Sequence, residues 1–196
     1  ASQAAGGTVT LGLLTSSTSV LVSSNGMIVD DNDVNGGADT NPANDTILVN
    51  ITAPSVSLSS RSAIGACTVA NNALLGEIEI NATSLDASSG FLAGDDTAPI
   101  YVAGLGASLT LGTVSSDDDG AGGVRDEIRI RSAGSILDGN DGSTAGTSNV
   151  IGGAVTLRAN AGIGACTGDA VGELEVTSTS LTAQSGLNAG DDAAAI

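Results

Sequence analysis

Each of the two cysteines in this 196-residue chain lies in the same pentapeptide, IGACT, at residues 64–68 and again at 163–167. A thiol acts as a nucleophile or a metal ligand only as the thiolate, which a neighbouring cation favours. The chain has no histidine and no lysine, and neither pentapeptide contains a basic residue. Three roles stay open for Cys67 and Cys166: a packed free thiol, a crosslink to a neighbouring chain, and a metal ligand, the least favoured.

Acidic and amide side chains form the second group that could do chemistry. They cluster beside glycines in the stretches DDND (30–33) and DGND (138–141), and hard oxygen donors are what calcium prefers. The candidate calcium ligands are Asp30, Asp31, Asp33, Asp138, Asn140 and Asp141. Because their spacing matches neither an EF-hand nor the glycine-rich calcium repeat, calcium binding competes with a simpler interpretation as solvated turns.

Three asparagines, Asn44, Asn50 and Asn81, fit the N-x-[ST] pattern and are candidate glycosylation sites. Catalysis has less support. Without histidine or lysine the chain lacks the usual proton-transfer groups near neutral pH, and the arginines at 125, 129 and 131 stand beside acids with which they can pair. We therefore predict that the protein is not an enzyme and has no cofactor other than calcium.

The formal net charge of −17 excludes some partners. It opposes binding to nucleic acid and to anionic lipid surfaces, and no apolar run is long enough to span a bilayer. Hydrophobic residues make up 41% of the chain, but it contains one Phe, one Tyr and no Trp. The predicted core is therefore narrow and aliphatic.

The chain consists of two tandem repeats, residues 1–100 and 101–196, of about 98 residues each. Residues 1–12 align with 101–112, MIVDDND (27–33) with SILDGND (135–141), and 76–100 with 172–196. Neither end of the chain resembles a cap, and repeat proteins need atypical terminal units to close their ends. We therefore expect an excerpt of a longer array, or copies that stack on one another.

Short segments with apolar residues two apart recur inside each repeat and predict strands that bury one face. The segments are SVLV (19–22), SVSL (55–58), EIEI (77–80), PIYV (99–102), EIRI (127–130), AVTL (154–157) and ELEV (173–176). In this pattern Glu77, Glu79 and Arg129 should point to solvent. Missing aromatics and the period within each repeat favour an all-β parallel β-helix, or β-solenoid, of about four coils per repeat over a string of β-sandwiches.

The stretches GGAVTLRANAGIG (152–164) and TSLTAQSG (179–186) resemble the repeats of very large bacterial surface and secreted proteins of the filamentous-haemagglutinin type. That resemblance implies a right-handed parallel β-helix, export from the cell and a structural or adhesive role.

Four coils spaced by about 4.8 Å would separate Cys67 from Cys166 by roughly 19 Å along the axis, too far for a disulfide between them. We predict a non-enzymatic extracellular filament or cell-surface adhesin segment. Its expected partners are copies of itself, and a cell surface or a polysaccharide is a further candidate target. The alternatives are a calcium-rigidified stalk of sandwich modules and, less favoured, a carbohydrate-active β-helix enzyme.

Overall fold

A computed structural model describes residues 7–32, 48–66, 76–91, 97–116, 125–140, 147–164 and 172–186. These residues form sixteen strands and no helix, and every strand pair is parallel. Within these ranges, therefore, nothing helical could cross a membrane.

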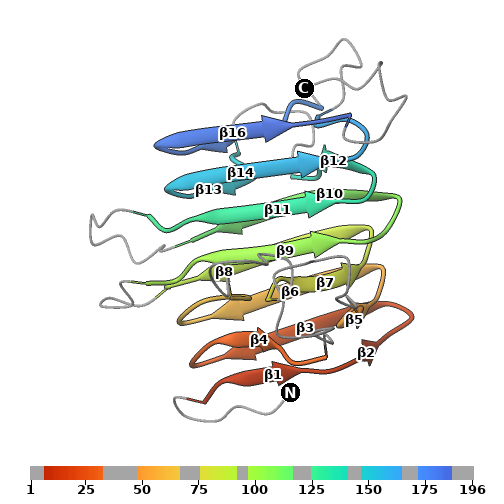
Figure 1. The fold of residues 1–196 in the computed structure, drawn as a ribbon, viewed down its shortest axis with the longest axis vertical. Helices are drawn as coiled ribbons and strands as arrows, with labels where there is room; N and C mark the ends of the chain where they lie inside the picture. Colours follow the sequence, from red (N-terminus) through yellow and green to blue (C-terminus); the bar gives the residue numbers. More distant parts are fainter. Residues whose placement is uncertain are drawn as a thin grey trace, which may run out of the picture.

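The strands form two sheets that face each other across the core (Figure 1). Sheet A contains, in order along the axis, β2 (Leu14–Thr15), β5 (Ile51–Thr52), β7 (Ile78–Asn81), β9 (Ile100–Gly104), β11 (Ile128–Ser132), β14 (Ala154–Ala159) and β16 (Ser180–Gln184). Sheet B contains β3 (Ser19–Ser24), β6 (Ser55–Ser60), β8 (Ser84–Ser89), β10 (Ser108–Ser115), β13 (Val150–Ile151) and β15 (Val176–Thr177), and β12 (Ser135–Asp138) also pairs with β10. Two further strands, β1 (Val9–Leu11) and β4 (Ile28–Asp30), pair with each other and join sheet A through single bridges from Ile28 to Ile64 and from Ile64 to Ile100.

The chain passes alternately from one sheet to the other, so that each coil contributes one layer to each sheet. Strands of one layer, such as β1 and β2, β4 and β5, or β12 and β13, share a sheet, whereas the next layer along the chain lies in the opposite sheet. Each layer pairs with the layers one coil below and above. This arrangement confirms the predicted all-β parallel β-solenoid. The alternative fold, a string of sandwich modules, is wrong, because such modules are built from antiparallel strands.

The alternating sequence pattern explains which side chains fill the core. In β11, Ile128 and Ile130 are fully buried, whereas Arg129 between them points outward, as predicted. Ile128 lies in register between Ile100 and Val155 of the neighbouring layers, and the buried cluster consists of Ile, Leu, Val and Ala side chains. Burying each large aliphatic side chain contributes roughly 1.5–3 kcal/mol, so the stacked layers supply the main stabilisation.

The two repeats have the same strand pairing, but in opposite sheets. In repeat 1 the pairs Leu14–Ile51 and Thr15–Thr52 lie in sheet A. The corresponding pairs in repeat 2, Val114–Val150 and Ser115–Ile151, lie in sheet B. The paired residues of repeat 1 and of repeat 2 occupy equivalent positions in the repeat alignment, so the register is the same in both. The second repeat is therefore the first one turned by about half a turn around the solenoid axis.

Counting strand layers explains this inversion. From β1 and β2 in sheet A, the chain passes through β3, then β4 with β5, then β6, then Ile64 with β7, then β8, then β9, before it reaches the equivalent strand β10 in sheet B. That is seven steps, an odd number, so equivalent segments alternate between sheets. Seven layers of this kind make three and a half coils per repeat, close to the predicted four.

Buried serines at the turns follow the same alternation. Ser24 ends β3 in sheet B, and its Oγ donates to the Met27 carbonyl at 3.0 Å. Its equivalent in repeat 2, Ser132, ends β11 in sheet A and donates to the Ser135 carbonyl at 3.0 Å. Each hydroxyl satisfies a carbonyl at a corner where the backbone leaves the sheet.

Candidate functional site

A buried asparagine connects three layers of repeat 1. Asn50, just before β5, is fully buried. Its Nδ2 donates to Asp30 Oδ1 at 2.5 Å, and its Oδ1 accepts from the Glu79 backbone N–H at 2.8 Å. The Asn50 N–H also donates to the Glu79 carbonyl at 2.9 Å. The amide therefore joins β4, β5 and β7, and we call this group the asparagine node.

Repeat 2 contains the same node in the other sheet. Asn149, just before β13, is fully buried. Its Nδ2 donates to Asp138 Oδ1 at 2.7 Å and to the Leu111 carbonyl at 2.9 Å, and its Oδ1 accepts from the Glu175 N–H at 3.0 Å. The recurrence of these contacts in both repeats shows that the node belongs to the repeated architecture.

The acidic residues predicted to bind calcium divide into three groups. Asp33 and Asp141 lie outside the described residues. Asp30 and Asp138 are part of the asparagine nodes, and each also accepts a hydrogen bond from the backbone N–H two residues later, at 3.0 Å in both cases. Asp31 is exposed. The described residues contain no group of three or more acidic, cysteine or histidine side chains placed to hold a metal ion, so calcium binding stays a prediction.

The third residue of each acidic turn supports the same node. Asn32 Oδ1 accepts from Asn50 Nδ2 at 3.0 Å, and Asn32 Nδ2 donates to the Val49 carbonyl at 3.1 Å. Asn140 Nδ2 donates to the Gly112 carbonyl at 3.2 Å, whereas its buried Oδ1 has no hydrogen-bond partner. These contacts give both acidic turns a structural role.

The candidate glycosylation sites differ in accessibility. Asn81 is exposed at the end of β7, and Asn44 lies outside the described residues. Asn50 is fully buried, and both ends of its side-chain amide are hydrogen-bonded. A glycan on Asn50 would have to replace those bonds, so the folded chain has no room for one there. The sequence alone could not reveal this burial, because its causes lie in neighbouring coils.

The two IGACT motifs lie in opposite sheets. Cys67 and Cys166 are outside the described residues, but the isoleucines that start the motifs are placed: Ile64 bridges Ile28 and Ile100 in sheet A, and Ile163 bridges Ile136 in sheet B. Both isoleucines are buried. The glycines that follow have nearly the same backbone angle, φ of 73° at Gly65 and 74° at Gly164. The described part of each pentapeptide is therefore the same in both repeats: a single bridging isoleucine followed by a glycine with positive φ.

The outer face of sheet A carries a buried ion pair across the boundary between the repeats. Glu77 and Glu79 alternate with inward isoleucines, but they are 1% and 0% exposed. The prediction that they face solvent was therefore wrong. Glu77 Oε2 accepts a hydrogen bond from Arg131 Nε, two layers away in β11. Burial raises the pKa of Glu77, and the charge of Arg131 only partly opposes this shift.

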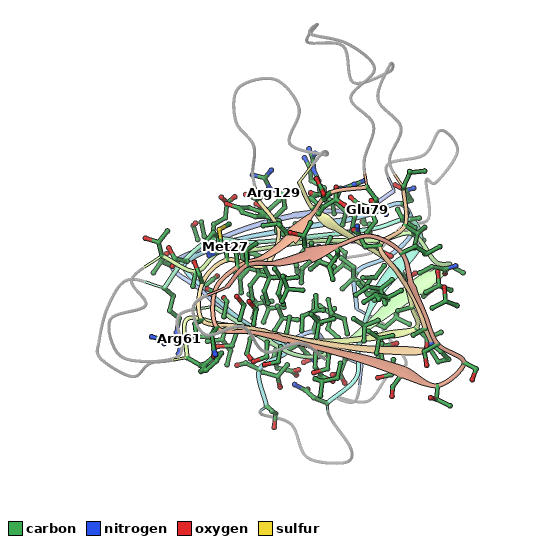
Figure 2. All side chains as sticks on the ribbon, turned by 90° about the horizontal axis from the view of Figure 1, so that it is seen from below. Met27, Arg61, Glu79 and Arg129 are labelled. Carbon is green, nitrogen blue, oxygen red and sulfur yellow. The ribbon has the colours of Figure 1, made fainter. Side chains whose placement is uncertain are left out.

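Beside this pair, a second cluster joins an arginine to an aromatic ring. The Arg129 guanidinium lies 5.4 Å from the centre of the Tyr101 ring, within the range of a cation–π contact. Arg129 Nη2 also lies 3.0 Å from Glu127 Oε1, and the Tyr101 hydroxyl donates to Glu127 Oε2 at 3.0 Å. Figure 2, seen from the β1 end, shows Glu79 and Arg129 on the outside of the same side of the solenoid. Of the three arginines expected to pair with acids, Arg129 pairs with the neighbouring Glu127 and Arg131 with Glu77. Arg125 donates to Ser115 Oγ and to the Ser116 carbonyl.

At the end of the solenoid that carries β1 and β2, none of the described residues forms a further layer over these strands. A cavity of about 570 Å³ lies there between the two sheets, lined by residues of β1, β2 and β3. Leu14 is 39% exposed at this end, and Leu181 in β16 is 52% exposed at the opposite end. Both ends therefore present apolar side chains together with strand edges that lack a neighbour among the described residues.

A second cavity, of about 500 Å³, lies along the turns that follow β2, β5, β7 and β9. Its lining consists of Ser, Thr, Asn, Pro, Ala and Gly, without an ionisable side chain. Hydroxyl and amide groups of this kind can hydrogen-bond a polar surface, but the lining contains no acid and base pair.

Comparison with known proteins found no matching family model, no similar curated protein and no similar solved structure.

Proposed function

We propose that this protein is a non-enzymatic structural segment of an extracellular or cell-surface rod, of the fibre or adhesin kind. One observation carries the proposal: parallel strand pairing continues in both sheets through the boundary between the repeats. Across that boundary β9 pairs with β7 below and β11 above, and β10 pairs with β8. The two repeats are thus joined by the same bonds that hold each repeat together.

The physical properties of this arrangement suit a rod. Parallel strands spaced by about 4.8 Å add length in proportion to the number of coils, and each repeat needs contacts only with its neighbours. The resemblance of residues 152–164 and 179–186 to filamentous-haemagglutinin repeats supports the same proposal, because it implies export from the cell and an adhesive role. The high negative charge keeps the surface hydrated and soluble.

Electron microscopy of the purified protein over a range of concentrations tests this proposal. We expect elongated particles that associate into fibres, with a spacing of about 4.8 Å along the fibre axis in diffraction. Isolated particles at every concentration, without such a repeat, would contradict it. Antibody labelling of intact, unpermeabilised source cells tests the surface location.

Two further proposals have separate tests. Calcium bound by the acidic turns should raise the melting temperature, and the rise should disappear in an Asp30→Asn, Asp138→Asn double variant.

The second proposal is that the hydroxyl-rich cavity beside Pro54 and Thr83 binds a surface polysaccharide. Glycan-array binding that is lost on Thr83→Val would support it, whereas cleavage of a polysaccharide would contradict the non-enzymatic proposal.

A further inference from the structure

The exposed leucines at the two ends occupy positions that are buried where the repeats meet. Leu14 corresponds to Val114, and Leu181 corresponds to Leu85, by the alignment of the repeats. Val114 and Leu85 are both 0% exposed, against 39% for Leu14 and 52% for Leu181. The difference arises because β10 lies on β8 inside the chain, whereas β2 and β16 have no neighbour on their outer edges among the described residues.

The internal contact between β8 and β10 therefore provides a template for the ends. β8 ends repeat 1 in the same way that β16 ends repeat 2, and β10 begins repeat 2 as β1 and β2 begin repeat 1. The pairs observed inside the chain are Ser84–Thr110, Leu85–Leu111, Ala87–Val114 and Ser88–Ser115. The register shifts between Leu111 and Val114, and β1 and β2 are separated at the equivalent place, Gly12 and Leu13.

The strands at the two ends of the solenoid also belong to the same sheet. One repeat inverts the sheets, but two repeats restore them, so that both β16 and β1–β2 belong to sheet A. A second copy can thus be placed on the first by translation along the axis, with a rotation that follows only the twist of the solenoid. No half turn is needed.

We propose that the β1–β2 end of one copy docks on the β16 end of a second copy of this chain, in the register of the β8–β10 contact. This inference deepens the proposed rod function and rests on it. The pairs between copies are Ser180–Thr10, Leu181–Leu11, Ala183–Leu14 and Gln184–Thr15. Docking covers Leu14 and Leu181 and closes the cavity between the sheets.

Outward side chains at the contact are compatible with this register. Inside the chain, Asp86 Oδ1 accepts from the Thr113 N–H at 3.0 Å. The corresponding residues at the ends are Thr182 and Leu13, and the Thr182 hydroxyl can accept from the Leu13 N–H in the same way. The outward Leu13 side chain then stays exposed, as that of Thr113 does.

Engineered disulfides test the register directly. In a background with Cys67→Ser and Cys166→Ser, the variant Thr10→Cys with Ser180→Cys places two exposed side chains on paired positions, with Cα atoms about 5 Å apart. The matched control, Thr10→Cys with Thr182→Cys, is two residues out of register, with Cα atoms about 8 Å apart. We expect a ladder of crosslinked oligomers on non-reducing gels for the first variant, forming at least about tenfold faster than for the control.

Leucine substitutions test the apolar contact without a crosslink. Leu14→Asp and Leu181→Asp should each weaken self-association at least about tenfold in sedimentation velocity. Leu13→Asp, at a leucine that is 68% exposed, should leave association unchanged. Equal loss with Leu13→Asp would show unspecific hydrophobic association and would overturn the register.

The outcomes separate this inference from the proposed function. Fibres in the microscope without the crosslinked ladder would overturn the docking register and leave the rod function standing, with lateral contacts as its basis. A ladder without fibres from the unmodified chain would support the register and contradict the fibre proposal. Absence of both would overturn both.

Discussion

Single buried polar side chains determine how neighbouring coils align. Apolar stacks tolerate a two-residue slip along the strand direction, because such a slip keeps the same face inward and Ile, Leu and Val side chains contact one another without direction. Asn50 and Asn149 do not tolerate it, since each needs a carboxylate on one side and a backbone N–H on the other. We infer that the asparagine nodes fix the register of three layers in each repeat.

Replacing this amide should therefore cost much stability. Asn50→Ala leaves Asp30 Oδ1 without its amide donor and the buried Glu79 N–H without its acceptor. We expect the free energy of unfolding to fall by about 3 kcal/mol, measured by urea denaturation. Asn81→Ala, at an exposed asparagine, is the control and should change it by less than about 0.5 kcal/mol. Equal effects of the two variants would show that the node contributes no more than an exposed amide.

The raised pKa of Glu77 predicts a pH dependence. Between the ordinary value of 4.5 and the raised pKa, the folded chain holds a proton that the unfolded chain has lost, so the contribution of Glu77 to stability falls as pH rises through this window. Glu77→Gln keeps an acceptor for Arg131 but cannot titrate. Its unfolding free energy should therefore fall less steeply with pH than that of the wild type, in urea titrations at a series of pH values. A steeper fall in the variant would mean that Arg131 lowers the pKa of Glu77 instead.

In both repeats a glycine directly follows a single bridging isoleucine. Gly65 and Gly164 both have positive φ, a conformation that costs an L-residue about 1–2 kcal/mol. A Cβ on Gly65 would also lie 2.6 Å from the Tyr101 carbonyl oxygen, whereas on Gly164 the nearest atom would be the Gly172 oxygen at 3.4 Å. We expect thermal unfolding to show a larger loss for Gly65→Ala than for Gly164→Ala. Gly12→Ala, which meets nothing within 4 Å, should be nearly neutral, and a reversed order would contradict the placement of these glycines.

The strands could be predicted from the sequence because alternation of apolar residues reports directly on burial. SVSL (55–58) and AVTL (154–157) are both in strands with this pattern. The inversion of the repeats was harder to predict, since the strand at Ile64 is a single bridging residue and leaves no alternation to count. Burial of Glu77 could not be predicted at all, because its partner Arg131 lies 54 residues away in sequence.

The two repeats place their equivalent strands in opposite sheets, and this determines how often a surface feature recurs along the solenoid. Equivalent segments alternate between the two sides of the solenoid, so Ile64 with Gly65 and Ile163 with Gly164 lie in opposite sheets. In any longer array built from such repeats, features on one side would recur only every second repeat, after seven coils or about 34 Å. A lateral partner would meet the same surface at that spacing on both sides of the rod.

Net charge should control how readily copies stack. Each copy carries a formal charge of −17, and the ion pair between Glu77 and Arg131 has no equivalent between copies, where the corresponding residues are Glu173 and Ser23. Raising the salt concentration from about 10 mM to about 150 mM shortens the Debye length from about 30 Å to about 8 Å, which screens the repulsion and leaves the contact of Leu14 and Leu181 in place. Self-association measured by sedimentation velocity should therefore strengthen over this range. If it weakened instead, opposite charges would have to face each other across the contact, and the apolar docking of β1 and β2 on β16 would be wrong.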